Sequence, residues 1–192
     1  MRRNYINQNS EEGLIMTSYP AGGMVSNHLQ NSKFYNRSQA KIIAEAHYKM
    51  GYDLYESIVL LIQSGNYKNE DICKMWPAFV NIAFSCEIIL KLFYENDHGE
   101  MAHGHKLYTK LFDKLSDASK KIISDITINN MIVRGYDNYN YDDFKDDLKK
   151  SENTFEYERY VFEIIPGNSH SLQNAFLLSF AEGLNRLAKQ MQ

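Results

Sequence analysis

The side chains best suited to acid–base or metal chemistry lie close together between residues 95 and 105. Three acids and three histidines occur within these eleven residues: Glu95, Asp97, His98, Glu100, His103 and His105. Zinc sites on helices usually place two ligands four residues apart, as in HExxH. Here the histidines follow one another at steps of five and two, and two glycines interrupt the segment. We therefore predict a polar connection that holds no metal and no cofactor.

Two further charged residues interrupt sequence faces that are otherwise apolar. Glu87 lies inside an apolar segment, and Arg159 falls between Phe155 and Phe162 at steps of four and three residues. An arginine that held this carboxylate across a helical bundle would fix the register of two helices. Lys91, four residues after Glu87, is a simpler partner on the same helix.

These observations leave a structural, a binding and a catalytic interpretation open. In the binding interpretation, Arg159, Glu163 and Glu87 line a cleft for a phosphate or a base. In the structural interpretation, which we favour, four polar residues support the fold: Asn81, Glu87, Lys91 and Arg159. In the catalytic interpretation, Glu87, His105 and Arg159 are the candidates for acid–base work on a phosphate. His105 has a third use, because a histidine just before a helix can brace it or face a ligand.

A lysine stripe is the strongest candidate for nucleic-acid binding. Lys106, Lys110 and Lys114 recur every four residues, which on a helix places them on one face that could bind phosphates. The same pattern is typical of a solvated helix face. An acidic run, residues 142–147, carries the opposite charge and could dock a basic partner or a second subunit.

Composition excludes several classes of protein. The 192 residues carry 21 Lys and Arg against 24 Asp and Glu, a net charge of −3, which is unlike a protein that coats nucleic acid by charge alone. The chain contains no GxSxG, P-loop or GxGxxG motif. The chain has only two cysteines and no leader-like segment, which predicts a cytoplasmic protein. It has no apolar run of about 20 residues, so we expect that it does not enter a membrane.

The chain divides into an arm and one domain. Residues 1–36 are rich in Asn and Ser without an apolar period, which predicts a flexible polar arm. Residues 37–192 are predicted to form a single helical-bundle domain. A long first helix starts near Ser38, and its core face is predicted from spacings of three and four: Ile43, His47, Met50, Leu54, Ser57 and Leu61. On that face, His47 is expected to be a satisfied core histidine.

Five more helices follow in the predicted order. The second, over about 77–94, is apolar nearly all round and should be central. A short third helix covers 107–115, and Ser116 or Asp117 caps a fourth that ends near Asn130. The fifth runs past Ser151 as far as Phe162, and the last covers 177–191. No strand alternation is visible, so we predict an all-α, up-and-down bundle of five or six helices.

Four segments together resemble a bacterial group of HEPN-domain proteins. They are Pro77–Lys91 (PAFVNIAFSCEIILK), Gly104–Leu107 (GHKL), Leu111–Leu115 (LFDKL) and Glu158–Tyr160 (ERY), and the resemblance extends over about residues 38–192. It implies a HEPN-like helical bundle that commonly forms a homodimer. It also implies an association with RNA cleavage or binding, toxin–antitoxin pairs and phage defence.

The usual catalytic motif of that superfamily is missing. Its active members carry an Arg followed a few residues later by a His, and the pair forms a metal-independent ribonuclease site completed across the dimer. The nearest ordered pair here, Arg159 and His170, has ten residues between its members. We therefore expect a non-catalytic or degenerate binding or regulatory module for RNA, a nucleotide or a protein partner. The alternative is a ribonuclease toxin with a non-standard site.

Overall fold

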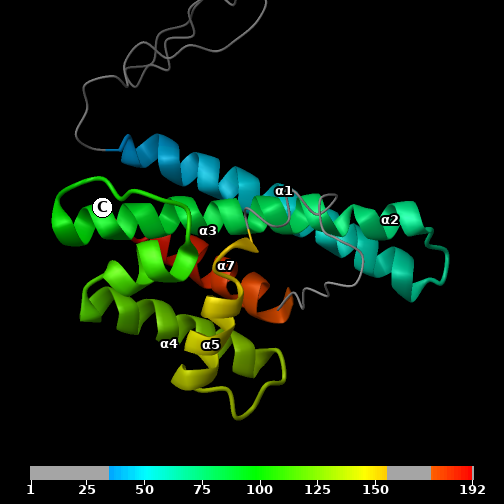
Figure 1. Ribbon diagram of the computed structural model, residues 1–192. Helices are drawn as coiled ribbons and strands as arrows, with labels where there is room; N and C mark the ends of the chain where they lie inside the picture. Colours follow the sequence, from blue (N-terminus) through cyan, green and yellow to red (C-terminus); the bar gives the residue numbers. More distant parts are fainter. Residues whose placement is uncertain (1–34, 155–173, 192) are drawn as a thin grey trace, which may run out of the picture. The chain divides into compact units, whose positions relative to one another are not determined.

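The computed structural model describes residues 35–154 and 174–191, and every regular element in these ranges is helical. The elements are α1 (Arg37–Gln63), α2 (Asn69–Cys73), α3 (Met75–His98), a π-helix η1 (Leu107–Leu111), a 3-10 turn η2 (Phe112–Lys114), α4 (Asp117–Val133), α5 (Tyr141–Lys150) and α7 (Asn174–Ala188) (Figure 1). The predicted all-α bundle is confirmed. The predicted arm lies outside the described residues except for Tyr35 and Asn36, and Asn36 caps α1 by accepting the backbone N–H of Gln39.

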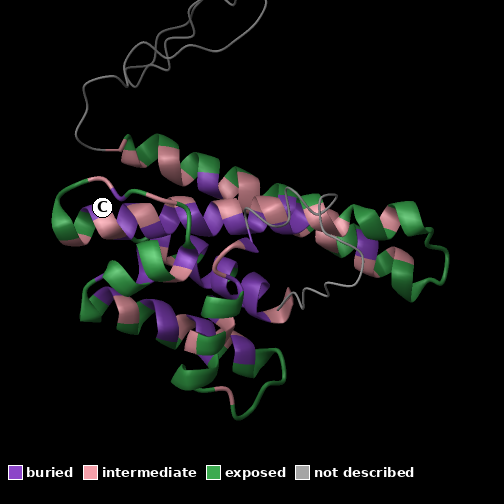
Figure 2. Ribbon diagram, in the orientation of Figure 1, coloured by how far each residue is buried: buried purple, intermediate pink, exposed green. Residues whose placement is uncertain are grey.

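Helix α3 is the centre of the described bundle, as its apolar sequence predicts. It packs against α1, α7 and η1, and half of its residues are buried (Figure 2). Helix α4 packs on α7, and α5 contacts α4, α7 and η1. Because α3 has neighbours on several sides, polar side chains on it must find partners inside the protein.

The face that α1 turns to α3 differs from the predicted one. The buried residues of α1 are Ala44, Gly51 and Ile58, seven residues apart, whereas Met50 is 53% exposed and Ile43 38% exposed. The prediction weighted large apolar side chains. Two of the three buried residues, Ala44 and Gly51, are small, and a residue without a bulky side chain lets two helix backbones approach closely.

The segment predicted as a short third helix is not an α-helix. Lys106 is extended, residues 107–111 form a π-helical turn and residues 112–114 a 3-10 turn. The buried side chains of Leu107 and Leu111 anchor the turn, and the backbone N–H of Leu107 donates to the carbonyl of Glu152. A π-turn changes the phase of the helix, so spacing by four no longer keeps residues on one face.

The other helix boundaries agree with the sequence in part. Ser116 caps α4 through its side chain, as predicted. The fifth helix was predicted to continue through Ser151, but α5 ends at Lys150, and Ser151 is its C-cap. Residues 155–173, which include Phe155 and Phe162, lie outside the described residues. The short helix α2 between α1 and α3 was not predicted.

The segment 69–98, which contains α3, is long and apolar enough to cross a membrane by length and composition alone. Its most apolar window is 61% buried inside the described bundle. A core helix of a soluble protein passes the same test, so the segment is weak evidence for a membrane span.

The contact at Gly51 generates a stability prediction. A Cβ atom at this position would lie 2.6 Å from the carbonyl oxygen of Ala78 and 2.7 Å from Cγ1 of Ile82. Gly51→Ala should therefore lower the free energy of unfolding by about 1–3 kcal/mol, because α1 and α3 must move apart. Urea denaturation measures this difference. Helix propensity alone predicts the opposite sign, so a stabilised Gly51→Ala variant would show that the helices are not in close contact there.

Candidate functional site

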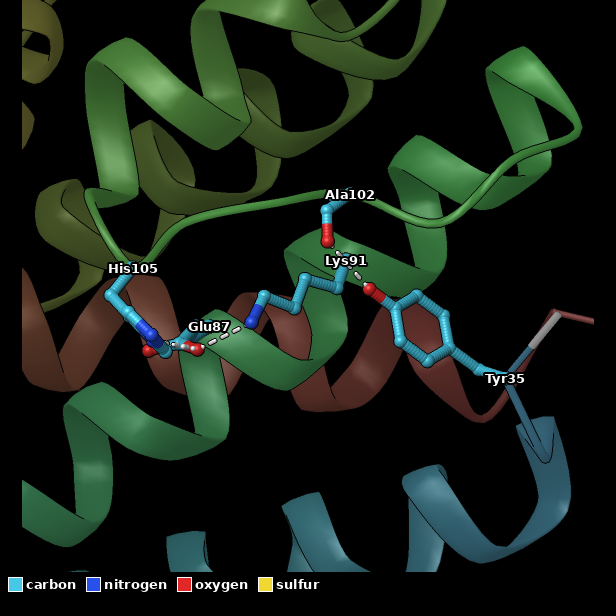
Figure 3. A network of polar contacts seen from close by, with 5 residues as sticks. All are labelled: Tyr35, Glu87, Lys91, Ala102 and His105. Atoms are coloured by element: carbon cyan, nitrogen blue, oxygen red, sulfur yellow. Dashed lines mark hydrogen bonds and ion pairs between the residues drawn. The ribbon is translucent and has the colours of Figure 1, made fainter. Parts of the chain in front are cut away.

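The most distinctive polar cluster of the described residues surrounds Glu87 in the middle of α3. The side chain of Glu87 is 2% exposed. Its Oε1 atom accepts from Nζ of Lys91 at 2.7 Å and lies 2.8 Å from Nδ1 of His105 (Figure 3). The predicted local partner, Lys91, is therefore confirmed. His105 is a second partner, which only the catalytic interpretation grouped with this acid.

His105 reaches Glu87 because the connection after α3 turns back over that helix. Gly104 adopts φ +99°, a left-handed conformation that a residue with a side chain rarely adopts. The aliphatic stem of Lys110 packs against Gly104, where a Cβ atom would lie 3.3 Å from Cβ and Cγ of Lys110. His105 itself stays 55% exposed at the ring. It thus joins a buried carboxylate to the protein surface.

A second buried acid, Glu95, ties the start of α1 to α3. Its side chain is fully buried, and it accepts the backbone N–H of Tyr35 at 2.8 Å and Nε of Arg37 at 3.0 Å. The hydroxyl of Tyr35 then donates to the carbonyl of Ala102 at 2.9 Å (Figure 3). Burial, and next the charge of Glu95, raises the pKa of Tyr35, so its hydroxyl remains a hydrogen-bond donor.

Asp97 and His98, two other members of the acid–histidine segment, have separate partners. Asp97 accepts the backbone N–H of Ser116 at 2.8 Å and the hydroxyl of Ser119 at 2.8 Å, which secures the start of α4. Nε2 of His98 lies 2.7 Å from the carbonyl of Lys114. Within the described ranges, no three His, Cys, Asp or Glu side chains are arranged to hold a metal ion. The segment connects helices through several distinct contacts.

Asn81 and His47 form a separate pair between α1 and α3. Nδ1 of His47 lies 2.7 Å from Oδ1 of Asn81, whose amide donates to the carbonyl of Pro77 at 2.8 Å. The His47 ring also meets Phe84 edge-on, with 4.7 Å between ring centroids. Asn81 therefore has the structural role predicted for it, and His47 is a satisfied histidine of the helix interface.

The lysine stripe is exposed but does not form the predicted helix face. Lys106 precedes η1, Lys110 lies within it and Lys114 ends η2, so the three residues belong to different backbone conformations. All three are exposed. Lys114 also lies 3.7 Å from Asp113, which offsets its charge. Lys106 and Lys110 are left as the basic residues nearest in sequence to His105.

The cluster could orient a histidine but contains no activated nucleophile among the described residues. A carboxylate at Nδ1 sets the orientation and tautomer of an imidazole, which is the role of the acid in many acid–base sites. Cys86, next to Glu87 in sequence, is fully buried, and this burial raises the pKa of its thiol. A buried neutral thiol is unreactive. Arg159, the third predicted member, lies outside the described residues.

Sequence reasoning missed Tyr35 and the role of Glu95. Tyr35 falls in the segment predicted as an arm, and no local pattern marks it. Glu95 had a usable signal, because Glu87, Lys91 and Glu95 recur every four residues along α3, an acid–base–acid series on an otherwise apolar helix.

No family model, no curated protein and no solved structure matches this chain.

The shared oxygen of Glu87 generates a second stability prediction. Lys91→Met removes the partner that best neutralises a buried carboxylate, so it should lower the free energy of unfolding by about 3 kcal/mol. The double variant Glu87→Leu/Lys91→Met removes both charges and should recover most of that loss. Urea denaturation of the single and double variants measures both values.

Lys121→Met is the matched control, because Lys121 and Asp125 form an ion pair that is largely exposed. Such pairs contribute little, so the control should stay close to the wild type. Equal losses in Lys91→Met and Lys121→Met would contradict a buried ion pair at Glu87.

Proposed function

We propose that this protein is a non-catalytic, HEPN-like helical module that binds RNA. The observation that carries the proposal is the exposed edge His105–Lys106–Lys110, which the Glu87 contact holds against α3. An imidazole and two ammonium groups on one short segment suit the phosphates of a nucleic acid strand. Because the whole chain carries a net charge of −3, the attraction for RNA phosphates comes from this edge rather than from the overall charge. Salt screens such exposed charges, so the binding should weaken as the salt concentration rises.

Two of the described arginines are engaged in contacts between helices, which favours a binding role over a catalytic one. Arg37 pairs with Glu95 and Arg134 pairs with Glu182, so these two guanidinium groups serve contacts between helices. Ribonuclease chemistry without a metal needs an acid–base group and a cation within reach of one phosphate. The carboxylate of Glu87 instead contacts Lys91 and His105, while Arg37 and Arg134 pair elsewhere.

The biological setting follows from the resemblance to HEPN-domain proteins. We propose a cytoplasmic homodimer that acts in a toxin–antitoxin or phage-defence system. Two observations support parts of this setting. Both cysteines of the chain are free thiols, as a reducing compartment favours. Helix α1 also carries exposed apolar side chains, Ile42, Met50 and Leu60, of the kind that a second subunit covers.

Removing the two lysines tests the RNA-binding proposal. Lys106→Ala/Lys110→Ala should weaken binding of a labelled single-stranded RNA, because two phosphate contacts are lost. The salt dependence should also flatten, by about 0.7 in the logarithmic slope for each contact. Fluorescence anisotropy across a salt series measures both effects. The control Lys49→Ala/Lys68→Ala removes equal charge elsewhere and should bind almost as the wild type does; equal weakening in both pairs would refute the proposed edge.

A ribonuclease remains the second candidate, because the 2.8 Å contact between His105 and Glu87 resembles an oriented acid–base pair. We expect no cleavage when the purified protein is incubated with total RNA in EDTA. His105→Ala, which removes the imidazole, should give the same pattern on a denaturing gel. Cleavage that survives EDTA and disappears in His105→Ala would replace the binding module with a metal-independent ribonuclease.

A further inference from the structure

A small pocket opens beside the Glu87 cluster, between the start of α1 and the middle of α3. Its volume is about 290 Å³, near the lower end of the range for ligand sites. Its walls are mainly apolar and come from Ala40 and Ile43 of α1 and from Phe84 and Ile88 of α3. Glu87 and Lys91 supply its polar side. This combination, an apolar body with few polar groups, is typical of a site for a small ring.

One carboxylate oxygen of Glu87, a residue that lines this pocket, has no hydrogen-bond donor in the part of the chain that the structure describes. Oε2 of Glu87 is buried and has no hydrogen-bond partner among the described residues, although Oε1 of the same carboxylate has two. A buried carboxylate oxygen without a donor costs free energy, so such an atom calls for an explanation. The terminal torsion of a glutamate is soft, so the carboxylate of Glu87 can rotate to present an oxygen to a ligand in the pocket.

The charges of the site select a neutral ligand. Glu87 is already matched by Lys91, and Glu95 by Arg37. A cation would therefore compete with Lys91, and an anion would face a carboxylate at the same place. A neutral ring with an N–H group beside a carbonyl satisfies both residues, because the N–H donates to Glu87 and the carbonyl accepts from Lys91, which carries three donors.

We propose that this pocket binds an unpaired nucleobase with an N–H beside a carbonyl, that is, uracil or guanine. The ring would pack against Phe84, Ile43 and Ile88, as unstacked bases pack on aromatic and apolar side chains. The inference rests on the proposed function. An RNA strand bound at Lys106 and Lys110 would lie near Glu87, because His105, the residue before Lys106, contacts Glu87. It adds a preference among bases to binding that phosphate contacts alone would leave non-specific.

The test uses the full chain with uridine, guanosine and N3-methyluridine as probes. Saturation-transfer NMR and calorimetry should show binding of uridine and guanosine. N3-methyluridine should bind at least about tenfold more weakly, because the methyl group removes the donor to Glu87. Ile43→Trp fills the pocket from α1 and should weaken uridine binding by a similar factor. Ile42→Trp is the matched control, since Ile42 is 65% exposed and does not line the pocket, and it should bind uridine normally.

Each result separates this inference from the proposed function. Salt-dependent RNA binding without any uridine or guanosine binding would overturn the base pocket and leave the RNA-binding module intact. Uridine binding without RNA binding would support the pocket and overturn the module. Equal affinity for uridine and N3-methyluridine, or equal losses in Ile43→Trp and Ile42→Trp, would overturn the contact with Glu87. Circular dichroism of both tryptophan variants checks that they fold.

Discussion

Helix α3 places two carboxylates, Glu87 and Glu95, inside a bundle whose core is mostly apolar. Glu87 and Glu95 lie eight residues apart, and each needs donors from a different part of the chain. Glu95 takes them from the residues just before and at the start of α1, while Glu87 takes one from its own helix and one from His105. Leaving either acid without donors would cost several kilocalories per mole, so these contacts constrain how the neighbouring segments approach α3.

The two acids position the connection that follows α3, at Ala102 and at His105. Tyr35, which Glu95 holds through the backbone, donates in turn to the carbonyl of Ala102, and His105 meets Glu87 three residues later. The connection is therefore held to α3 at two points. Gly104 supplies the left-handed backbone between them. The same geometry that gives the buried carboxylates their donors thus brings His105 and the following lysines to one exposed edge.

The pocket and the close helix contact reflect two demands on α1. In its middle, Gly51 lets the backbone meet Ala78 and Ile82 of α3, which leaves no room for a ligand. Near its start, Ala40 and Ile43 line a cavity beside Glu87 instead. A large side chain is excluded from the first place, whereas the second leaves space beside Glu87, one of whose oxygens has no donor among the described residues. The α1–α3 pair therefore combines a tightly packed contact at Gly51 with a polar group, Glu87, that is incompletely satisfied. Binding sites commonly show that combination.

The sequence by itself determined the helical class, the central position of α3, the cap at Ser116 and the Glu87–Lys91 pair, because each depends on residues close together in the chain. It misplaced the core face of α1, since hydrophobic spacing undervalues Gly51, and it made an α-helix of the π-turn around Lys110. Only the tertiary structure decided the contacts of Glu87 with His105 and of Glu95 with Tyr35. Those contacts join residues 18 and 60 positions apart, and which distant donor meets a buried acid depends on how whole helices pack.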